Sequence, residues 1–263
     1  MQAIVQGIGL FGPGLDGWAA GSAVLRGERE YMPARTQVPA PQLLPAAERR
    51  RTNFTVKLAL AAGFEAVQAA GRDPRMLASV FSSSGADGQN CHEICEALAS
   101  PAREISPTRF HNSVHNAAAG YWSIATGSMS PCNVLSAFDA SFAAGLLETL
   151  VQVQTSAAPV LLIGYDTQYP EPLHAKRPLP DAFGVSLLLA PAGAGVGLAQ
   201  IQARLGEGGE TRLPLAALES LRASIPAARS LPLLQSLATG VRGDIVLPYL
   251  PPLQLVVSVR PCG

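Results

Sequence analysis

Short apolar runs alternate with segments of helical periodicity along most of this chain. Pro159 to Gly164 is a continuous apolar stretch of the kind that forms a strand buried on both faces. Met76 to Ser82 and Ala182 to Leu189 have the same character, whereas Thr52 to Ala70 has its apolar residues at helical spacing. Strands that alternate with helices in this way predict an α/β fold, built on a mostly parallel sheet that helices cover on both faces.

The same reasoning places the other elements. A buried strand is predicted from Ala3 into a glycine-rich turn that ends at Gly14, and residues 106–116 are predicted to be a polar connector. The remaining predicted helices span 18–27, 90–98, 117–126, 140–150, 213–223 and 227–238, and the remaining strands span 195–203, 244–248 and 253–259.

Charged residues are scarce, at 14% of the 263 residues against about 25% in a typical soluble domain. Hydrophobic residues make up 48%. A chain with so few charges either buries a large core or covers part of its surface with a partner. Its formal net charge is zero, so nothing in the charge balance indicates a nucleic acid as ligand.

Nothing in the sequence indicates secretion or a membrane span. The N-terminus lacks the basic region and apolar core of a signal peptide, and glycine and proline interrupt the longest uncharged stretches. The four cysteines, at positions 91, 95, 132 and 262, form no disulfide framework. We therefore expect reduced thiols in a cytoplasmic protein, with Cys91 and Cys95 a buried pair on one helix face and not zinc ligands, and Cys132 also buried.

The segment with the most chemical information lies between Pro131 and Leu150. An apolar strand runs into Ser136 to Phe138, and a helix of small residues follows from Ala140. Many enzymes place a nucleophile on such a strand-to-helix turn, because the N-terminus of the helix stabilises a developing negative charge. Here the head of the turn holds Asp139, which we expect to cap the helix through backbone N–H groups.

This segment resembles the nucleophile turn of the β-ketoacyl synthases, whose pattern is roughly Thr-Ala-Cys-Ala/Ser-Ser-Gly followed by a helix with a glutamate. Residues 137–141 overlie that pattern without gaps, and Glu148 falls on the family's glutamate. The reactive cysteine position is then taken by Asp139. Further segments are similar to family motifs in the same order: 5–9 and 12–13, 18, 25–27, 116–120, 160–166, 177–178 and 183–189.

The resemblance covers about residues 1–195 and implies a thiolase-like layered α/β fold (α-β-α-β-α). Residues 1–195 would form a complete ketosynthase-like N-terminal half. Residues 196–263 would form a strongly abbreviated C-terminal half that completes the same fold.

The resemblance also implies which groups condensation needs. They are the cysteine of the turn and two histidines that lie in the family's C-terminal half. This chain has four histidines, at 92, 111, 115 and 174, and none lies in that half. With Asp139 at the vacated nucleophile position, we expect no catalytic residues. The residues 110–123 are similar to short synthase-like subunits of aryl polyene pathways. The predicted function is therefore a catalytically inactive subunit of the chain length factor type, which pairs with an active ketosynthase.

The sequence is also compatible with two other functions. One is an enzyme of different chemistry on the same scaffold, a thioester hydrolase or a malonyl decarboxylase; a relay of Ser136, His115 and Asp139 is conceivable. Another is an acyl-binding module that acts alone, as a homodimer. His111 and His115 have an i,i+4 spacing but no third ligand, so neither a metal nor another cofactor is predicted.

Two groups of side chains are candidates for binding. Phe138 and Phe142 flank the turn, where they either gate an acyl tunnel or fill the core. The other tunnel candidates are Ser141, His115 and Asn116. Arg49, Arg50 and Arg51 form the one basic run, which is either a solvated helix start or a contact for an acidic acyl carrier protein.

Overall fold

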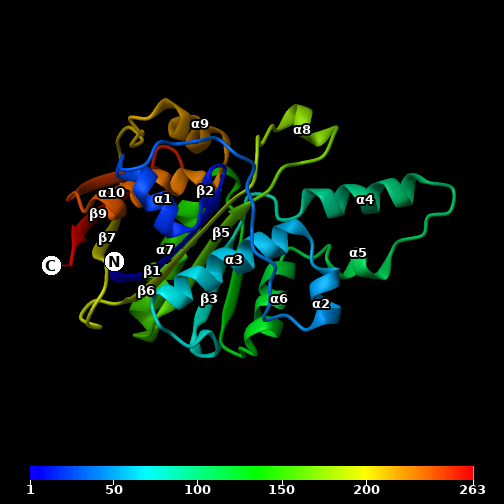
Figure 1. The fold of residues 1–263 in the computed structure, drawn as a ribbon, viewed down its shortest axis with the longest axis horizontal. Coiled ribbons are helices and arrows are strands. Elements are labelled where there is room, and N and C mark those ends of the chain that lie inside the picture. The colour runs from blue at the N-terminus through cyan, green and yellow to red at the C-terminus, as the bar shows by residue number, and fades with distance from the viewer. Residues whose placement is uncertain (263) are drawn as a thin grey trace.

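The chain folds around one mixed sheet. In a computed structural model, which describes residues 1–262, this sheet has nine strands and ten α-helices surround it (Figure 1). The hydrogen-bonded order is β4-β3-β5-β6-β1-β7-β9-β8, with β2 paired to β1. Among the described strands, the parallel pairs are β3–β4 and β3–β5, and the other pairs are antiparallel. The expectation of a mostly parallel sheet is therefore wrong. A strand covered on both faces is apolar throughout whichever way its neighbours run, so an apolar run indicates burial and not direction.

The elements have the following bounds. The strands are β1 Gln2–Gly12, β2 Leu15–Asp16, β3 Ala78–Ser82, β4 Cys132–Leu135, β5 Val160–Asp166, β6 Phe183–Pro191, β7 Ala199–Gly206, β8 Gly243–Pro248 and β9 Gln254–Pro261. The α-helices are α1 Trp18–Leu25, α2 Ala46–Arg51, α3 Phe54–Ala69, α4 Gly88–Ala99, α5 Pro107–His111, α6 Ala117–Thr126, α7 Ser141–Ser156, α8 Leu173–Lys176, α9 Ala216–Ser224 and α10 Leu231–Thr239. Short 3-10 helices are η1 Pro74–Met76, η2 Phe138–Ala140 and η3 Ala227–Ser230.

Helices cover both faces of the sheet. Successive side chains of a strand point to opposite faces, and β5 divides accordingly. Leu161 and Ile163 join a cluster with α3 and α6, whereas Val160 and Leu162 join a second cluster with α7 and the C-terminal helices. Every residue of β5 is buried, as the continuous apolar run predicted.

The residues beyond 196 extend the same sheet. Strand β7 pairs with β1, and β9 and β8 follow it to the edge. Their helices α9 and α10 gather at this end of the molecule (Figure 1). Leu218 and Leu234 belong to the same hydrophobic cluster as Leu10 and Leu146. The N-terminal and C-terminal segments therefore share one core.

The segment 88–111, which we call the arm, projects from the opposite end of the molecule (Figure 1). Of the residues of α4, only Asn90 is buried. Part of the predicted polar connector is helical, because Pro107 stands at the first position of α5, where proline is favoured. Cys91, Cys95 and Cys132 are exposed, which corrects the expectation of buried thiols; they lie on the arm and on the edge strand β4.

The predicted helix over 227–238 is two elements. Residues 227–230 form η3, and α10 begins at Leu231. Pro232 lies in the first turn of α10, where its missing N–H costs nothing, so a new helix begins there. The η3 segment is therefore a separate element that precedes α10.

Candidate functional site

A sharp turn joins β4 to α7, as the sequence predicted. Ser141 holds it from inside: its Oγ accepts from the N–H of Ala137 at 3.0 Å and donates to the carbonyl of Phe138 at 2.7 Å. Phe138 has a left-handed backbone, with φ of 50°. Non-glycine residues in this region are strained and occur preferentially at functional sites. The backbone of the turn is thus suited to present a side chain, but residues 137–140 are Ala, Phe, Asp and Ala, and none is a thiol or hydroxyl.

Asp139 does not cap a helix, which corrects our expectation; neither η2 nor α7 has a side-chain cap. Its Oδ1 lies 2.7 Å from Nη2 of Arg177, and its Oδ2 lies 3.1 Å from Nη2 of Arg229. Charge-assisted bonds to two guanidinium groups are stronger than bonds to neutral N–H groups. Both carboxylate oxygens of Asp139 are therefore engaged in ion pairs.

Phe138 faces outward from the turn. Its side chain is 64% exposed, and the guanidinium carbon of Arg177 lies 3.8 Å from its ring centroid. A cation held over an aromatic face is a favourable arrangement. The same arginine therefore binds Asp139 and covers one face of Phe138.

Asp166, at the end of β5, is a second structural carboxylate of the site. Its Oδ1 accepts from the N–H and the hydroxyl of Ser84 at 2.8 and 2.6 Å, and its Oδ2 accepts from the N–H of Ala227 at 2.8 Å. Burial raises the pKa of Asp166 to about 6, although the hydrogen bonds from Ser84 and Ala227 oppose the rise. Asp166 therefore ties the end of β3 and the start of η3 to β5.

The relay of Ser136, His115 and Asp139 is formed only in part. Ser136 Oγ lies 2.8 Å from His115 Nε2, but Asp139 bonds to the two arginines instead. Ser136 also donates to the carbonyl of Ser83, which can only accept. Because the hydroxyl has one proton, His115 must donate to Ser136 and cannot act as its base. The contact joins two loops and does not activate a nucleophile.

The other tunnel candidates lie in different parts of the structure, two in the interior and two at the surface. Ser141 and Phe142 are buried, and Phe142 belongs to the hydrophobic core beneath α7. His115 and Asn116 are exposed at the start of α6. His115 lines a small cavity beside Tyr165 that does not include Phe138, Ser141 or Phe142. The place of these residues in a tunnel stays a prediction for an assembled complex.

The three consecutive arginines form the last turn of α2. Arg49 is turned inward, with bonds to Oε1 of Gln42 and the carbonyl of Leu44. Arg51 pairs with Glu48 at 3.0 Å. Arg50 is exposed. Arg50 is thus the arginine of this run that is both exposed and without an ion pair among the described residues, and the contact of the run with a carrier protein stays a prediction.

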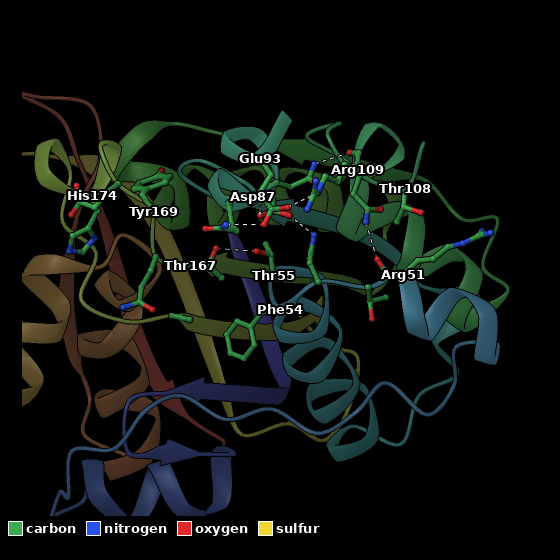
Figure 2. A pocket seen from close by; sticks show the side chains of 18 residues that line it. Arg51, Phe54, Thr55, Asp87, Glu93, Thr108, Arg109, Thr167, Tyr169 and His174 are labelled. Atoms are coloured by element: carbon green, nitrogen blue, oxygen red, sulfur yellow. Dashed lines mark hydrogen bonds and ion pairs between the residues drawn. The ribbon is translucent and has the colours of Figure 1, made fainter. Parts of the chain in front are cut away.

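A polar cleft of about 710 Å³ lies between the start of α3, the arm and the loop leading to α8 (Figure 2). Asp87 caps α4 by accepting from the N–H of Asn90, and the side chain of Asn53, the cap of α3, bonds to Asp87. Burial raises the pKa of Asp87. Glu93 and Arg109 pair across the arm at 2.7 Å. The Glu93–Arg109 ion pair joins α4 to α5, whereas neutral donors hold Asp87 between α3 and α4.

Sequence reasoning missed Arg177, Arg229 and Asp166 as partners at this site. An aspartate that ends a buried apolar strand was the available signal for Asp166. Nothing local identifies the arginines, which lie 38 and 90 residues from Asp139 in the sequence. Within residues 1–262, no three His, Cys, Asp or Glu side chains gather as metal ligands, and no helix has the length and apolarity to cross a bilayer.

Comparison with known proteins gives a consistent result. The profile of the family described as β-ketoacyl synthase, N-terminal domain, matches residues 24–222. A sequence search of curated proteins finds no match. One similar structure is the ketosynthase ApeO in complex with its chain length factor ApeC from Xenorhabdus doucetiae. It has a TM-score of 0.74 at 22% identity, over 98% of this chain and 99% of that chain.

Two further structures agree. The ishigamide ketosynthase/chain length factor has a TM-score of 0.73 at 10% identity, over 100% of this chain and 99% of that chain. A β-ketoacyl synthase from Burkholderia phymatum has a TM-score of 0.58 at 12% identity, over 92% of this chain and 71% of that chain. At these identities the likeness concerns the fold, and it confirms the thiolase-like α/β class.

Proposed function

Because this chain belongs to the β-ketoacyl synthase N-terminal-domain family, we propose that it is a catalytically inactive subunit of the chain length factor type. It pairs with an active ketosynthase and helps to shape the tunnel that holds a growing acyl or polyene chain. One observation carries the proposal. The turn that would hold the nucleophile presents Phe138 and an Asp139 engaged by two arginines.

The histidines support the same conclusion. His92 lies 3.2 Å from Glu96 on the arm, and His115 bonds to Ser136. His111 stacks edge-on with Tyr121, and His174 lines the polar cleft. Asp139 bonds only to arginines among the described side chains. His115 is the histidine nearest the turn, and its ring is bonded to Ser136 and not to Asp139, so no described histidine contacts the position of the family's cysteine.

The arm supports the need for a partner. Helix α4 is 12 residues long, and its main packing partner is α5. Isolated helices of this length are marginally stable in water, so a partner surface would stabilise α4. Leu98 and Phe110 on the arm are 49% and 68% exposed.

The sheet itself has an open edge. Strand β4 is the terminal strand, and Cys132 and Asn133 within it are exposed. Met129, just before this strand, is 97% exposed. An unpaired edge flanked by apolar side chains favours association with another chain. In the solved complexes named above, relatives of this fold are seen with a chain length factor partner.

The proposal is tested by co-expression with a catalytic ketosynthase from the same organism. We expect a heterodimer that condenses malonyl units only when both chains are present. The variant Phe110→Glu places a charge on the arm and should weaken the heterodimer at least about tenfold. The control Leu250→Glu changes a side chain of similar exposure, 65%, that lies outside the arm and should leave the affinity unchanged.

Two results would contradict the proposal. One is a chain that turns over acyl thioesters alone and loses this activity in the variant Asp139→Ala. The other is a Phe110→Glu variant that pairs as tightly as the unaltered chain while condensation proceeds without this subunit.

A further inference from the structure

The 3-10 helix η3, Ala227–Ser230, is a buried segment of the C-terminal part. Ala228 and Ser230 are fully buried, and Ala227 is 2% exposed. The segment lies against α7, β5 and β6. It is therefore packed over the ends of the strands where the nucleophile turn and Asp166 are located.

Two carboxylates hold η3 in this place. Asp166 accepts from its first N–H, at Ala227, at a distance of 2.8 Å. Asp139 binds its only charged side chain, Arg229, at 3.1 Å. The two aspartates come from different parts of the chain, one after β4 and one at the end of β5. Since both contacts converge on a segment of four residues, they fix its position and its orientation.

Arg177 reinforces the same arrangement from the other side. It follows α8, shares Asp139 with Arg229, and covers the ring of Phe138. The side chains of Arg177 and Arg229 are each 20% exposed, and that of Asp139 is 36% exposed. The three groups form one partly buried cluster at the head of α7.

Arg229 and η3 therefore occupy the space beside Asp139 at the head of α7. We infer that η3 is a built-in plug, latched by Asp139 and Asp166, that closes the acyl site of this subunit. The growing chain then meets this subunit only where it faces the partner, outside its own acyl site. This second part rests on the proposed function, whereas the latch itself belongs to the isolated chain.

The latch is tested on the isolated chain. Ser230→Cys places a thiol in the plug, and its alkylation by iodoacetamide is followed by peptide mass spectrometry, which separates it from the native cysteines. We expect slow alkylation in this background. Adding Asp139→Asn or Arg229→Gln should accelerate it at least about tenfold, because a charged hydrogen bond to the plug is lost.

The experiment has a control variant, Arg204→Gln, and a second measurement, hydrogen exchange. Arg204→Gln removes an arginine whose ion pair with Asp244 lies outside the site, and alkylation of the Ser230→Cys thiol should not change. Hydrogen exchange of residues 225–232, measured without the added cysteine, should rise in Asp139→Asn and Arg229→Gln while exchange in β5 and β6 stays slow. Unchanged exchange of the plug in both variants would overturn the latch.

The consequence for acyl binding is tested in the heterodimer with a photoactivatable acyl pantetheine. Crosslinks are expected on the partner subunit and absent from residues 225–232 and 138–146 of this chain. Labelling of those residues in the unaltered subunit would overturn the plug even if the heterodimer forms. Failure to form a heterodimer would contradict the proposed function and leave the result on the isolated chain standing.

Discussion

Asp139 and Asp166 show that the same side chain serves two physical roles within one site. Asp139 is partly exposed and is matched by two guanidinium groups. Asp166 is 2% exposed and is matched by neutral donors, the N–H groups of Ser84 and Ala227 and the hydroxyl of Ser84. Ion pairing compensates the charge of Asp139. The charge of Asp166 carries a desolvation cost that its hydrogen bonds only partly offset.

The raised pKa of Asp166 predicts how its contribution to stability depends on pH. The folded state binds this proton more tightly than the unfolded state, with a pKa of about 6 against 3.8. Its contribution is therefore largest below pH 4 and is lost as the pH rises through 6. The shift corresponds to about 3 kcal/mol.

Urea unfolding of the unaltered chain and of Asp166→Asn, measured between pH 4.5 and 7.5, checks this prediction. The asparagine variant cannot titrate and leaves one buried N–H without an acceptor, so it is less stable at low pH. The difference in free energy of unfolding between the two chains should shrink as the pH rises. Parallel pH profiles would contradict the raised pKa.

At the scale of elements, helix α3 and strand β1 show how closely the layers pack. A Cβ atom added at Gly9 would lie 2.0 Å from the carbonyl oxygen of Ala62, and one at Gly7 would lie 2.0 Å from that of Ala66. The backbone of the helix thus rests directly on the strand. This close approach positions the start of α3, and with it the cap Asn53, beside the polar cleft.

We predict that Gly9→Ala costs about 3 kcal/mol or more, because neither backbone can move aside without disturbing the core. The control is Gly120→Ala, an exposed position inside α6 with nothing within 4 Å of the added Cβ. It should stabilise the isolated chain by about 0.5–1 kcal/mol through its higher helix propensity. Thermal and urea unfolding measure both changes. Equal effects of the two substitutions would contradict the packing described.

At the scale of the whole molecule, the surroundings of the turn differ from the family pattern in more than the cysteine position. The four histidines serve the arm, the loops and the cleft, and the position facing Asp139 is filled by Arg229 of the plug. The effects on the rate of catalytic groups that act together are not additive, so restoring one group does not restore the rate.

We therefore predict that Asp139→Cys gives a reactive thiol but no condensation. Two neighbouring guanidinium groups and the start of α7 lower the pKa of a thiol at this position, so the introduced cysteine should be alkylated faster than the native cysteines. Turnover of a radiolabelled malonyl carrier by the isolated variant should stay at background. Measurable condensation would show that the histidines are dispensable and would contradict the proposed loss of catalysis.

The sequence by itself determined the family, the order of the main strands and helices, and the absence of a thiol or hydroxyl from residues 137–140. These features are local: periodicity places α3 and α6 with nearly their observed bounds, and residues 137–140 exclude a thiol whatever the fold. The direction of the strands was not determined, because apolar runs indicate burial alone.

The tertiary structure decided what Asp139 does. The local sequence favours a helix cap, and only the fold brings together Arg177 and Arg229, which lie 38 and 90 residues away. It also decided that Asp166 is desolvated and that η3 lies over the turn. Charge pairing and burial depend on which distant segments meet, and local sequence patterns do not contain that information.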